Sequence, residues 1–188
     1  MPDFSESVVK QVVINLKRIH SLGVRKVVVL GLEPVGCLPA IYETSDQTCS
    51  KTFNDLSKYH NSILKQAVNK LSNEISCPHK SVFRILDLYK AFMSAFKQKH
   101  QDCVGRSKFE KPFESCCVGL NGYSCGDVDE KGVKQYSVCE NPESSFFWDL
   151  LHPTQSGWLA VYSVLKLHFI HYSSRCFEAA VLRLQLSL

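Results

Sequence analysis

The sequence predicts an α/β fold built around a parallel sheet. Two segments with apolar residues at helical spacing alternate with two apolar runs, the first of them β-branched, in the order helix, strand, helix, strand. This order favours a layered fold in which a helix crosses between parallel strands. The chain has 188 residues, enough for one sizeable core, so we expect a single domain over residues 1–188.

The first helix and the first strand are expected within the opening residues. An amphipathic helix is predicted from Ser5 to Leu22, and Gly23 fits the position that ends a helix. The run from Val24 to Leu32 is apolar on both faces, which predicts a buried parallel strand. The apolar positions of the helix are Val8, Val9, Val12, Val13, Leu16 and Ile19.

The later elements are predicted by the same patterns. Helical periodicity runs from about Thr52 to Glu74, and the apolar run from Val82 to Leu88 predicts a second strand. A short helix is expected from Lys90 to Gln98, and a last helix begins near Pro153, since proline fits the first helical turn. The stripe expected to be buried on the last helix is Trp158, Val161, Tyr162, Leu165 and Phe169.

Composition excludes several classes of protein. A hydrophobic fraction of 45% and an aromatic fraction of 11% are those of a folded chain. The net charge of +4 comes from 22 basic and 18 acidic residues that are spread along the chain, so nucleic acid is not an expected partner. No apolar run is long enough to span a bilayer, so no integral membrane segment is expected.

The nine cysteines favour either paired thiols in an oxidising compartment or a metal site. Residues Met1 to Lys17 show no apolar stretch of the kind that a signal peptide contains, although the cysteines indicate secretion. We therefore expect an N-terminal portion to be missing from this chain. Five cysteines lie between Gln101 and Ser145, where a long irregular stretch needs cross-links or a function: Cys103, Cys116, Cys117, Cys125 and Cys139.

The strongest local signal is the segment Phe146-Phe-Trp-Asp-Leu-Leu-His-Pro-Thr154. It places the carboxylate of Asp149 and the imidazole of His152 three positions apart, in a turn before the last helix. If Asp149 accepts a hydrogen bond from Nδ1–H of His152, Nε2 can take a proton from a hydroxyl nucleophile. The two residues would then be two of the three members of a nucleophilic triad. A bare Asp-x-x-His pair is also common as a capping or surface interaction.

The surrounding residues resemble the plant GDSL esterase/lipase family of the SGNH hydrolase superfamily. The segment Phe147 to Thr154 is similar to the family's last block, F-W-D-x-x-H-P-T. The segment Gly31-Leu-Glu-Pro-Val-Gly-Cys-Leu-Pro39 resembles its G-x-x-P-x-G-C-x-P loop. Cys116-Cys117, Cys139-Glu-Asn-Pro142 and the helix around Asn54 follow in the family's order. The similarity covers about residues 5–170, which leaves 171–188 as a divergent tail.

The resemblance implies a flavodoxin-like α/β/α sandwich and hydrolysis of lipid or other acyl esters by a Ser-Asp-His mechanism. Only Asp149 and His152 carry over, as the orienting carboxylate and the general base. The family's nucleophile and oxyanion blocks normally precede the helix with which this chain begins, and none is present in the sequence. We therefore expect the N-terminal strands to be missing, the first strand to expose an unpaired apolar edge, and the chain alone to be inactive.

The resemblance also implies a secreted full-length protein that acts on a small-molecule ester or lipid, with no metal or organic cofactor, and we expect a monomer. The alternative is a non-catalytic, disulfide-stapled module from a truncated gene, which binds lipid or carbohydrate without turning it over. An ester assay on the purified chain separates the two hypotheses.

Vicinal cysteines seldom pair with each other, so Cys116 and Cys117 are expected to pair with Cys125 and Cys139 in an order that the sequence leaves open. Cys37 and Cys49 bracket a short loop and form another candidate bridge. A zinc site is the rival interpretation, but the spacing lacks paired C-x2-C knuckles. A further candidate pair is Cys77 with Cys103, and Cys176 has no assigned partner.

The remaining candidates have structural interpretations. Trp148 and Trp158 are predicted to be core residues. Ser144 and Ser156 are the serines nearest to the Asp-His pair, but neither lies in a strand-to-helix nucleophile turn, so neither is expected to be the nucleophile. Six histidines lack partner spacing and are expected to be solvated or capping: His20, His60, His79, His100, His168 and His171.

Overall fold

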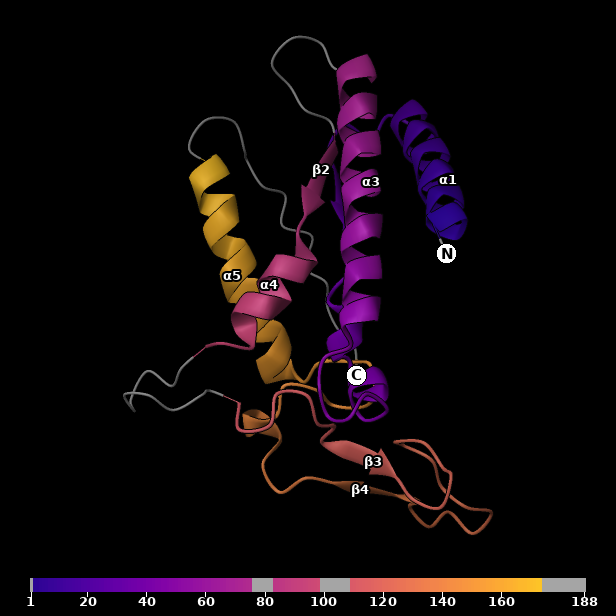
Figure 1. Ribbon diagram of the computed structural model, residues 1–188, viewed down its shortest axis with the longest axis vertical. Helices are drawn as coiled ribbons and strands as arrows, with labels where there is room; N and C mark the ends of the chain where they lie inside the picture. Colours follow the sequence, from indigo (N-terminus) through magenta and orange to yellow (C-terminus); the bar gives the residue numbers. More distant parts are fainter. Residues whose placement is uncertain (1, 76–82, 99–108, 174–188) are drawn as a thin grey trace.

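The computed structural model describes residues 2–75, 83–98 and 109–173 (Figure 1). The candidate pair Cys77 and Cys103, together with Cys176, lies outside these ranges. The helices are α1 (Pro2–Ser21), α2 (Pro39–Tyr42), α3 (Lys51–Ile75), α4 (Leu88–Ala95) and α5 (Gln155–Ser173), with single 3₁₀ turns η1 (Val35–Cys37) and η2 (Pro142–Ser144). The strands are β1 (Val27–Leu30), β2 (Phe83–Leu86), β3 (Cys117–Gly119) and β4 (Tyr136–Val138).

Strands β1 and β2 form a parallel pair, and α3 lies between them in the chain. The register places Val27 opposite Phe83 and Leu30 opposite Leu86. Parallel neighbours need a long connection, which the helix provides. The predicted pair of parallel strands with a helical crossover is therefore confirmed, with shorter strands than the apolar runs suggested.

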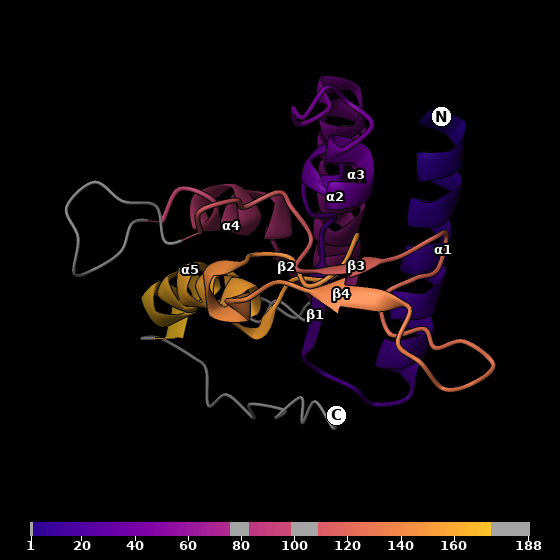
Figure 2. The ribbon, with the colours of Figure 1, turned by 90° about the horizontal axis from the view of Figure 1, so that it is seen from below.

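Helices α1 and α3 lie side by side and cover one face of the strand pair (Figures 1 and 2). Their inward residues alternate with the helical period, and β1 contributes Val27 and Val29 to the same contact. This first core contains Val9, Leu16, Leu64, Val68, Leu71 and Phe83 as buried residues. The amphipathic patterns of both helices thus meet on one side of the sheet.

The prediction that the first strand is buried on both faces is wrong for the described part of the chain. Val28 and Leu30 are 44% and 58% exposed, because α1 and α3 cover only the opposite face. Among the described residues, β1 pairs only with β2, so its other edge carries no partner strand. These observations agree with the second expectation for this strand, that it exposes an unpaired apolar edge.

A second core joins α4, α5 and the segment that precedes the Asp-His turn. Helices α4 and α5 pack together beside the strand pair, away from α1 (Figure 2). Phe146 and Phe147 are completely buried, and the ring of Phe146 makes edge-to-face contacts with Phe92 and Phe96. The residues just before Asp149 are thereby anchored in the core.

Two helices start or pack differently from the predictions. Helix α4 begins two residues early, because the Asp87 side chain accepts a hydrogen bond from the amide of Lys90 at 2.9 Å and caps it. Helix α5 begins after Thr154, and its Trp158 is 44% exposed, so the prediction that Trp158 is a core residue is wrong. Tyr162 is also exposed, while Val161 is buried. Leu165 is partly buried against the same core, and the side chain of Phe169 lies outside the described part of the chain.

The cysteine-rich stretch contains a small antiparallel pair, β3 with β4. Two disulfides, Cys116–Cys139 and Cys117–Cys125, lie at this pair. They resolve the order that the sequence left open, and they leave these four sulfurs bonded rather than free to bind zinc. The third predicted bridge, Cys37–Cys49, is also present.

Candidate active site

The Asp-His segment forms a tight turn that leads into α5. The amide of Trp148 donates a hydrogen bond to the carbonyl of His152 at 2.7 Å, and the amide of Thr154 donates to the carbonyl of Phe146 at 2.8 Å. These two bonds bring the segments before and after Asp149 side by side. The turn is therefore closed by backbone bonds and does not depend on the Asp149 side chain alone.

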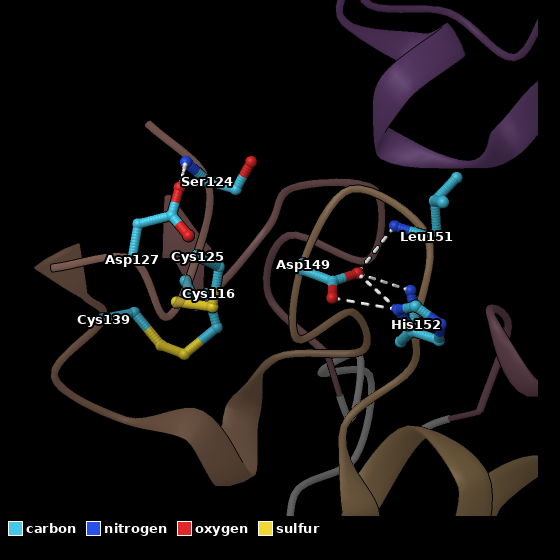
Figure 3. The surroundings of a disulfide bond; sticks show 9 residues. Cys116, Ser124, Cys125, Asp127, Cys139, Asp149, Leu151 and His152 are labelled. Carbon is cyan, nitrogen blue, oxygen red and sulfur yellow. Dashed lines mark hydrogen bonds and ion pairs between the residues drawn. A yellow bond between two sulfur atoms is a disulfide. The ribbon is translucent and has the colours of Figure 1, made fainter. Parts of the chain in front are cut away.

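Within this turn, the side chains of Asp149 and His152 face each other (Figure 3). Nδ1 of His152 lies 3.0 Å from Oδ1 and 2.9 Å from Oδ2 of Asp149, so the predicted contact is confirmed. The Asp149 side chain is 28% exposed and that of His152 is 73% exposed. The carboxylate is thus held against the protein while the imidazole projects toward solvent.

The carboxylate of Asp149 is stabilised in its charged form. Burial raises the pKa of this group, but hydrogen bonds from the amides of His152 and Leu151 outweigh it, and the imidazole contributes further. The amide distances to Oδ1 are 2.7 Å and 2.8 Å. The net result is a pKa below the ordinary value, so Asp149 is ionised at neutral pH and can orient an Nδ1–H.

Two neighbouring segments hold the turn from outside. The amides of Cys116 and Cys117 donate to the carbonyls of Phe147 and Trp148 at 3.1 Å and 2.6 Å. The amide of Ala40, just after the loop that follows β1, donates to the carbonyl of Leu150 at 3.2 Å. The turn therefore connects the cysteine-rich stretch, the loop after β1 and the start of α5.

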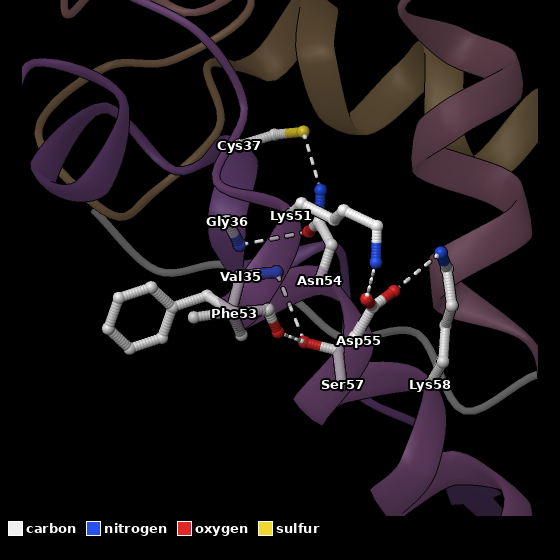
Figure 4. A network of polar contacts seen from close by, with 9 residues as sticks. All are labelled: Val35, Gly36, Cys37, Lys51, Phe53, Asn54, Asp55, Ser57 and Lys58. Carbon is white, nitrogen blue, oxygen red and sulfur yellow. Dashed lines mark hydrogen bonds and ion pairs between the residues drawn. The ribbon is translucent and has the colours of Figure 1, made fainter. Parts of the chain in front are cut away.

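The loop after β1 is held by side chains that the sequence did not single out for this role. On α3, Asn54 accepts a hydrogen bond from the amide of Gly36 at 3.0 Å, and Ser57 accepts one from the amide of Val35 at 3.4 Å (Figure 4). One turn further, Asn61 accepts from the amide of Leu32 and donates to its carbonyl. Their helical spacing was the available signal, since three small polar residues recur on an otherwise apolar face.

Gly36 is required by this close approach. A Cβ at this position would lie 2.2 Å from the carbonyl oxygen of Ser50, a backbone atom that cannot move aside easily. The amide of Ser50 also donates to the carbonyl of Gly36. The glycine thus allows the loop to pack against the start of α3, next to the Cys37–Cys49 bridge.

The other candidate residues make different contacts. The hydroxyl of Ser156 donates to Glu143 at 2.7 Å, and His20 lies 3.0 Å from a guanidinium nitrogen of Arg25. Burial lowers the pKa of His60. Within the described ranges, no three His, Cys, Asp or Glu side chains are grouped as metal ligands, and no helix is long and apolar enough to cross a membrane.

Taken together, the elements define an α/β protein with a parallel strand pair and a carboxylate–imidazole pair in the turn ahead of a helix. The sequence model of the GDSL-like lipase/acylhydrolase family matches residues 3–164. The chain belongs to this family.

Named relatives support the same assignment. The Arabidopsis thaliana protein GDSL esterase/lipase At5g03610 is 52% identical over 167 residues, which are 88% of this chain and 45% of that protein. GDSL esterase/lipase At3g09930 from the same plant is 45% identical over 170 residues, 89% of this chain and 47% of the relative. GDSL esterase/lipase ENOD8 of Medicago truncatula is 29% identical over 168 residues, 83% of this chain and 42% of the relative. The chain thus spans about half the length of these relatives.

Proposed function

We propose that this chain supplies the Asp149–His152 half of a serine-type ester hydrolase. The observation that carries the proposal is the contact of both Asp149 oxygens with Nδ1 of His152, in a turn that the surrounding backbone holds closed. Membership of the family supports an ester as substrate. The proposed substrate is a lipid or another small-molecule acyl ester.

In the proposed mechanism, Asp149 fixes the Nδ1–H tautomer and His152 acts as general base through Nε2. Nε2 takes the proton of a serine hydroxyl as that oxygen attacks the ester carbonyl carbon. The imidazolium that forms is stabilised by the Asp149 carboxylate and later returns the proton to the leaving alcohol. Water then repeats the cycle on the acyl-enzyme and releases the acid.

The nucleophile and the oxyanion donors are proposed to lie outside this sequence. Without a nucleophile no acyl-enzyme forms, and each missing oxyanion donor costs about 3–4 kcal/mol of transition-state stabilisation. We therefore propose that the 188-residue chain alone has no more than trace esterase activity. Assistance to water by a general base supplies only about 10²- to 10⁴-fold acceleration.

Three finer proposals follow from the same family membership. The strand pair with its helices is proposed to be part of a flavodoxin-like α/β/α sandwich and a single domain. The three disulfides support folding in an oxidising compartment, in keeping with a secreted protein. The protein is proposed to act as a monomer without a metal or organic cofactor.

The experiment is a chimera in which this chain replaces the matching region of GDSL esterase/lipase At5g03610. We expect the chimera to hydrolyse p-nitrophenyl butyrate, and His152→Ala to lower kcat by at least about 10³-fold. Asp149→Asn is expected to lower kcat by up to about 10⁴-fold through loss of the correct tautomer. His60→Ala, a matched change of a histidine without a proposed role, serves as control. A His152→Ala chimera as active as the control would refute the proposal.

A second candidate function is supported by the exposed apolar side chains of β1. A disulfide-stapled module could use Val28 and Leu30 to bind lipid without hydrolysing it. Sedimentation with phosphatidylcholine vesicles tests this, with Val28→Ser plus Leu30→Ser as the variant. Vesicle binding by the 188-residue chain that this variant abolishes, together with a chimera that has no esterase activity, would favour the module over the enzyme.

A further inference from the structure

The cysteine-rich stretch and the Asp149–His152 turn are joined backbone to backbone. We call residues 115–139 the cross-linked arm, because the disulfides Cys116–Cys139 and Cys117–Cys125 lie within it. Cys116 and Cys117 are 3% and 2% exposed, so the start of the arm is buried against the rest of the molecule. Figure 3 shows the Cys116–Cys139 bridge on one side of Asp149 and His152 on the other.

Backbone hydrogen bonds connect the arm to the backbone of His152 through Trp148. The amide of Cys139 donates to the carbonyl of Cys116 at 2.7 Å, and the amide of Cys117 donates to the carbonyl of Trp148 at 2.6 Å. The amide of Trp148 in turn donates to the carbonyl of His152. Trp148 is therefore bonded through its carbonyl to the disulfide-bonded Cys117 and through its amide to His152.

We propose that the cross-linked arm holds the turn in the geometry that aims Asp149 at His152, so that Cys116 and Cys117 are positioning residues. This proposal rests on the proposed function for the catalytic roles of Asp149 and His152. The geometric claim concerns only this chain and can be tested without an ester.

The arm needs its cross-links to act in this way. Strands β3 and β4 have three residues each, and an isolated two-stranded pair is at best marginally stable. Large apolar side chains of the arm face solvent instead of a core: Val118, Leu120, Tyr123, Val128, Val133 and Val138. The bridges, which span 23 and 8 positions, therefore supply constraint that side-chain packing does not.

Other contacts hold different parts of the turn. The hydroxyl of Thr154 donates to the carbonyl of Ser145 at 2.7 Å and accepts from the amide of Gly157 at 2.9 Å, which fixes the chain after His152. Ala40 contacts the middle of the turn at Leu150. The carbonyls of Phe147 and Trp148, which directly precede Asp149, receive amides from the arm. The arm thus supplies the backbone contacts of the two residues before Asp149, while the buried rings of Phe146 and Phe147 anchor the same segment in the core.

The first test measures the tautomer of His152 by nitrogen NMR in the histidine-labelled full chain at about pH 9, where imidazole is ordinarily neutral. The resonance is assigned by its loss in His152→Ala. We expect the Nδ1–H form in the unmodified chain, because the hydrogen bond at one ring nitrogen decides which carries the proton. Opening the arm with Cys117→Ser plus Cys125→Ser, or with Cys116→Ser plus Cys139→Ser, is expected to shift most of the population to Nε2–H.

The matched control opens the remaining bridge with Cys37→Ser plus Cys49→Ser. This change removes a disulfide of comparable span, 12 positions, but leaves the arm intact, so the Nδ1–H form should persist. Arm variants that fold and keep the Nδ1–H form would overturn the proposal. So would a control that shifts the tautomer as much as the arm variants do.

A second measurement uses the unmodified chain, in case the arm variants do not fold. If the arm holds the turn, the amides of Cys117, Trp148 and His152 should open together and share one free energy in native-state hydrogen exchange. Amides of Trp148 and His152 that exchange more than about tenfold faster than that of Cys117 would contradict the proposal. Neither measurement involves catalysis, so failure here is distinct from failure of the esterase assignment.

Discussion

Replacing Phe146 by alanine should destabilise the molecule more than any surface change near the site. The ring of Phe146 is completely buried, with its centroid 4.7 Å from that of Phe96 and 5.1 Å from that of Phe109. Truncation of a buried phenylalanine removes its transfer free energy and leaves a cavity, at a cost of about 3–5 kcal/mol. Domains of this size are stable by about 5–15 kcal/mol, so the loss is a large share of the total.

The assay is urea unfolding followed by tryptophan fluorescence, with Tyr162→Ala as the matched aromatic control on α5. Tyr162 is exposed, so its truncation should change the free energy of unfolding by no more than about 0.5 kcal/mol. The m-value should stay the same for both variants, because the surface exposed on unfolding hardly changes. A Phe146→Ala variant within 1 kcal/mol of the control would refute the view that this ring anchors the Asp-His turn.

Three further predictions concern named contacts. The pKa of Asp149 is lowered in the folded protein, so the ionised carboxylate contributes stability above its ordinary pKa of 3.8. This stability is lost as the pH falls through the pKa of the folded state. Asp149→Asn should therefore reduce the loss of stability below about pH 5, measured by unfolding at a series of acid pH values. Gly36→Ala should cost about 1–3 kcal/mol, measured by the urea midpoint, because the new Cβ would overlap the carbonyl of Ser50. Opening Cys37–Cys49 should cost about 2–4 kcal/mol, and a midpoint equal to that of the unmodified chain would contradict this.

The sequence predicted what local patterns determine. Helical periodicity located α1 and α3, apolar runs located β1 and β2, and the spacing of Asp149 and His152 predicted their contact. These features depend on neighbours along the chain, so a single sequence contains the information. The order of the two arm disulfides depends on how a long irregular segment folds back, which has no periodic signal.

Burial could not be predicted from apolarity alone. Val28 and Leu30 are apolar like the partly buried Val27 and Val29 of β1, but their exposure depends on whether another layer covers that face. Trp158 is likewise exposed because α4 and the aromatic cluster occupy only part of the α5 surface. The hydrogen bond of Asn54 to the amide of Gly36 was missed because the helical spacing of Asn54, Ser57 and Asn61 does not show which loop these side chains contact.

We propose that this chain holds the Asp-His half of an ester hydrolase and no nucleophile of its own. The most direct measurement is stopped-flow hydrolysis of p-nitrophenyl butyrate by the purified 188-residue chain, beside its His152→Ala variant. We expect no burst of p-nitrophenol and at most a trace steady rate. A stoichiometric burst that His152→Ala abolishes would contradict it, because a nucleophile would then lie within the chain, with Ser144 and Ser156 as the nearest candidates.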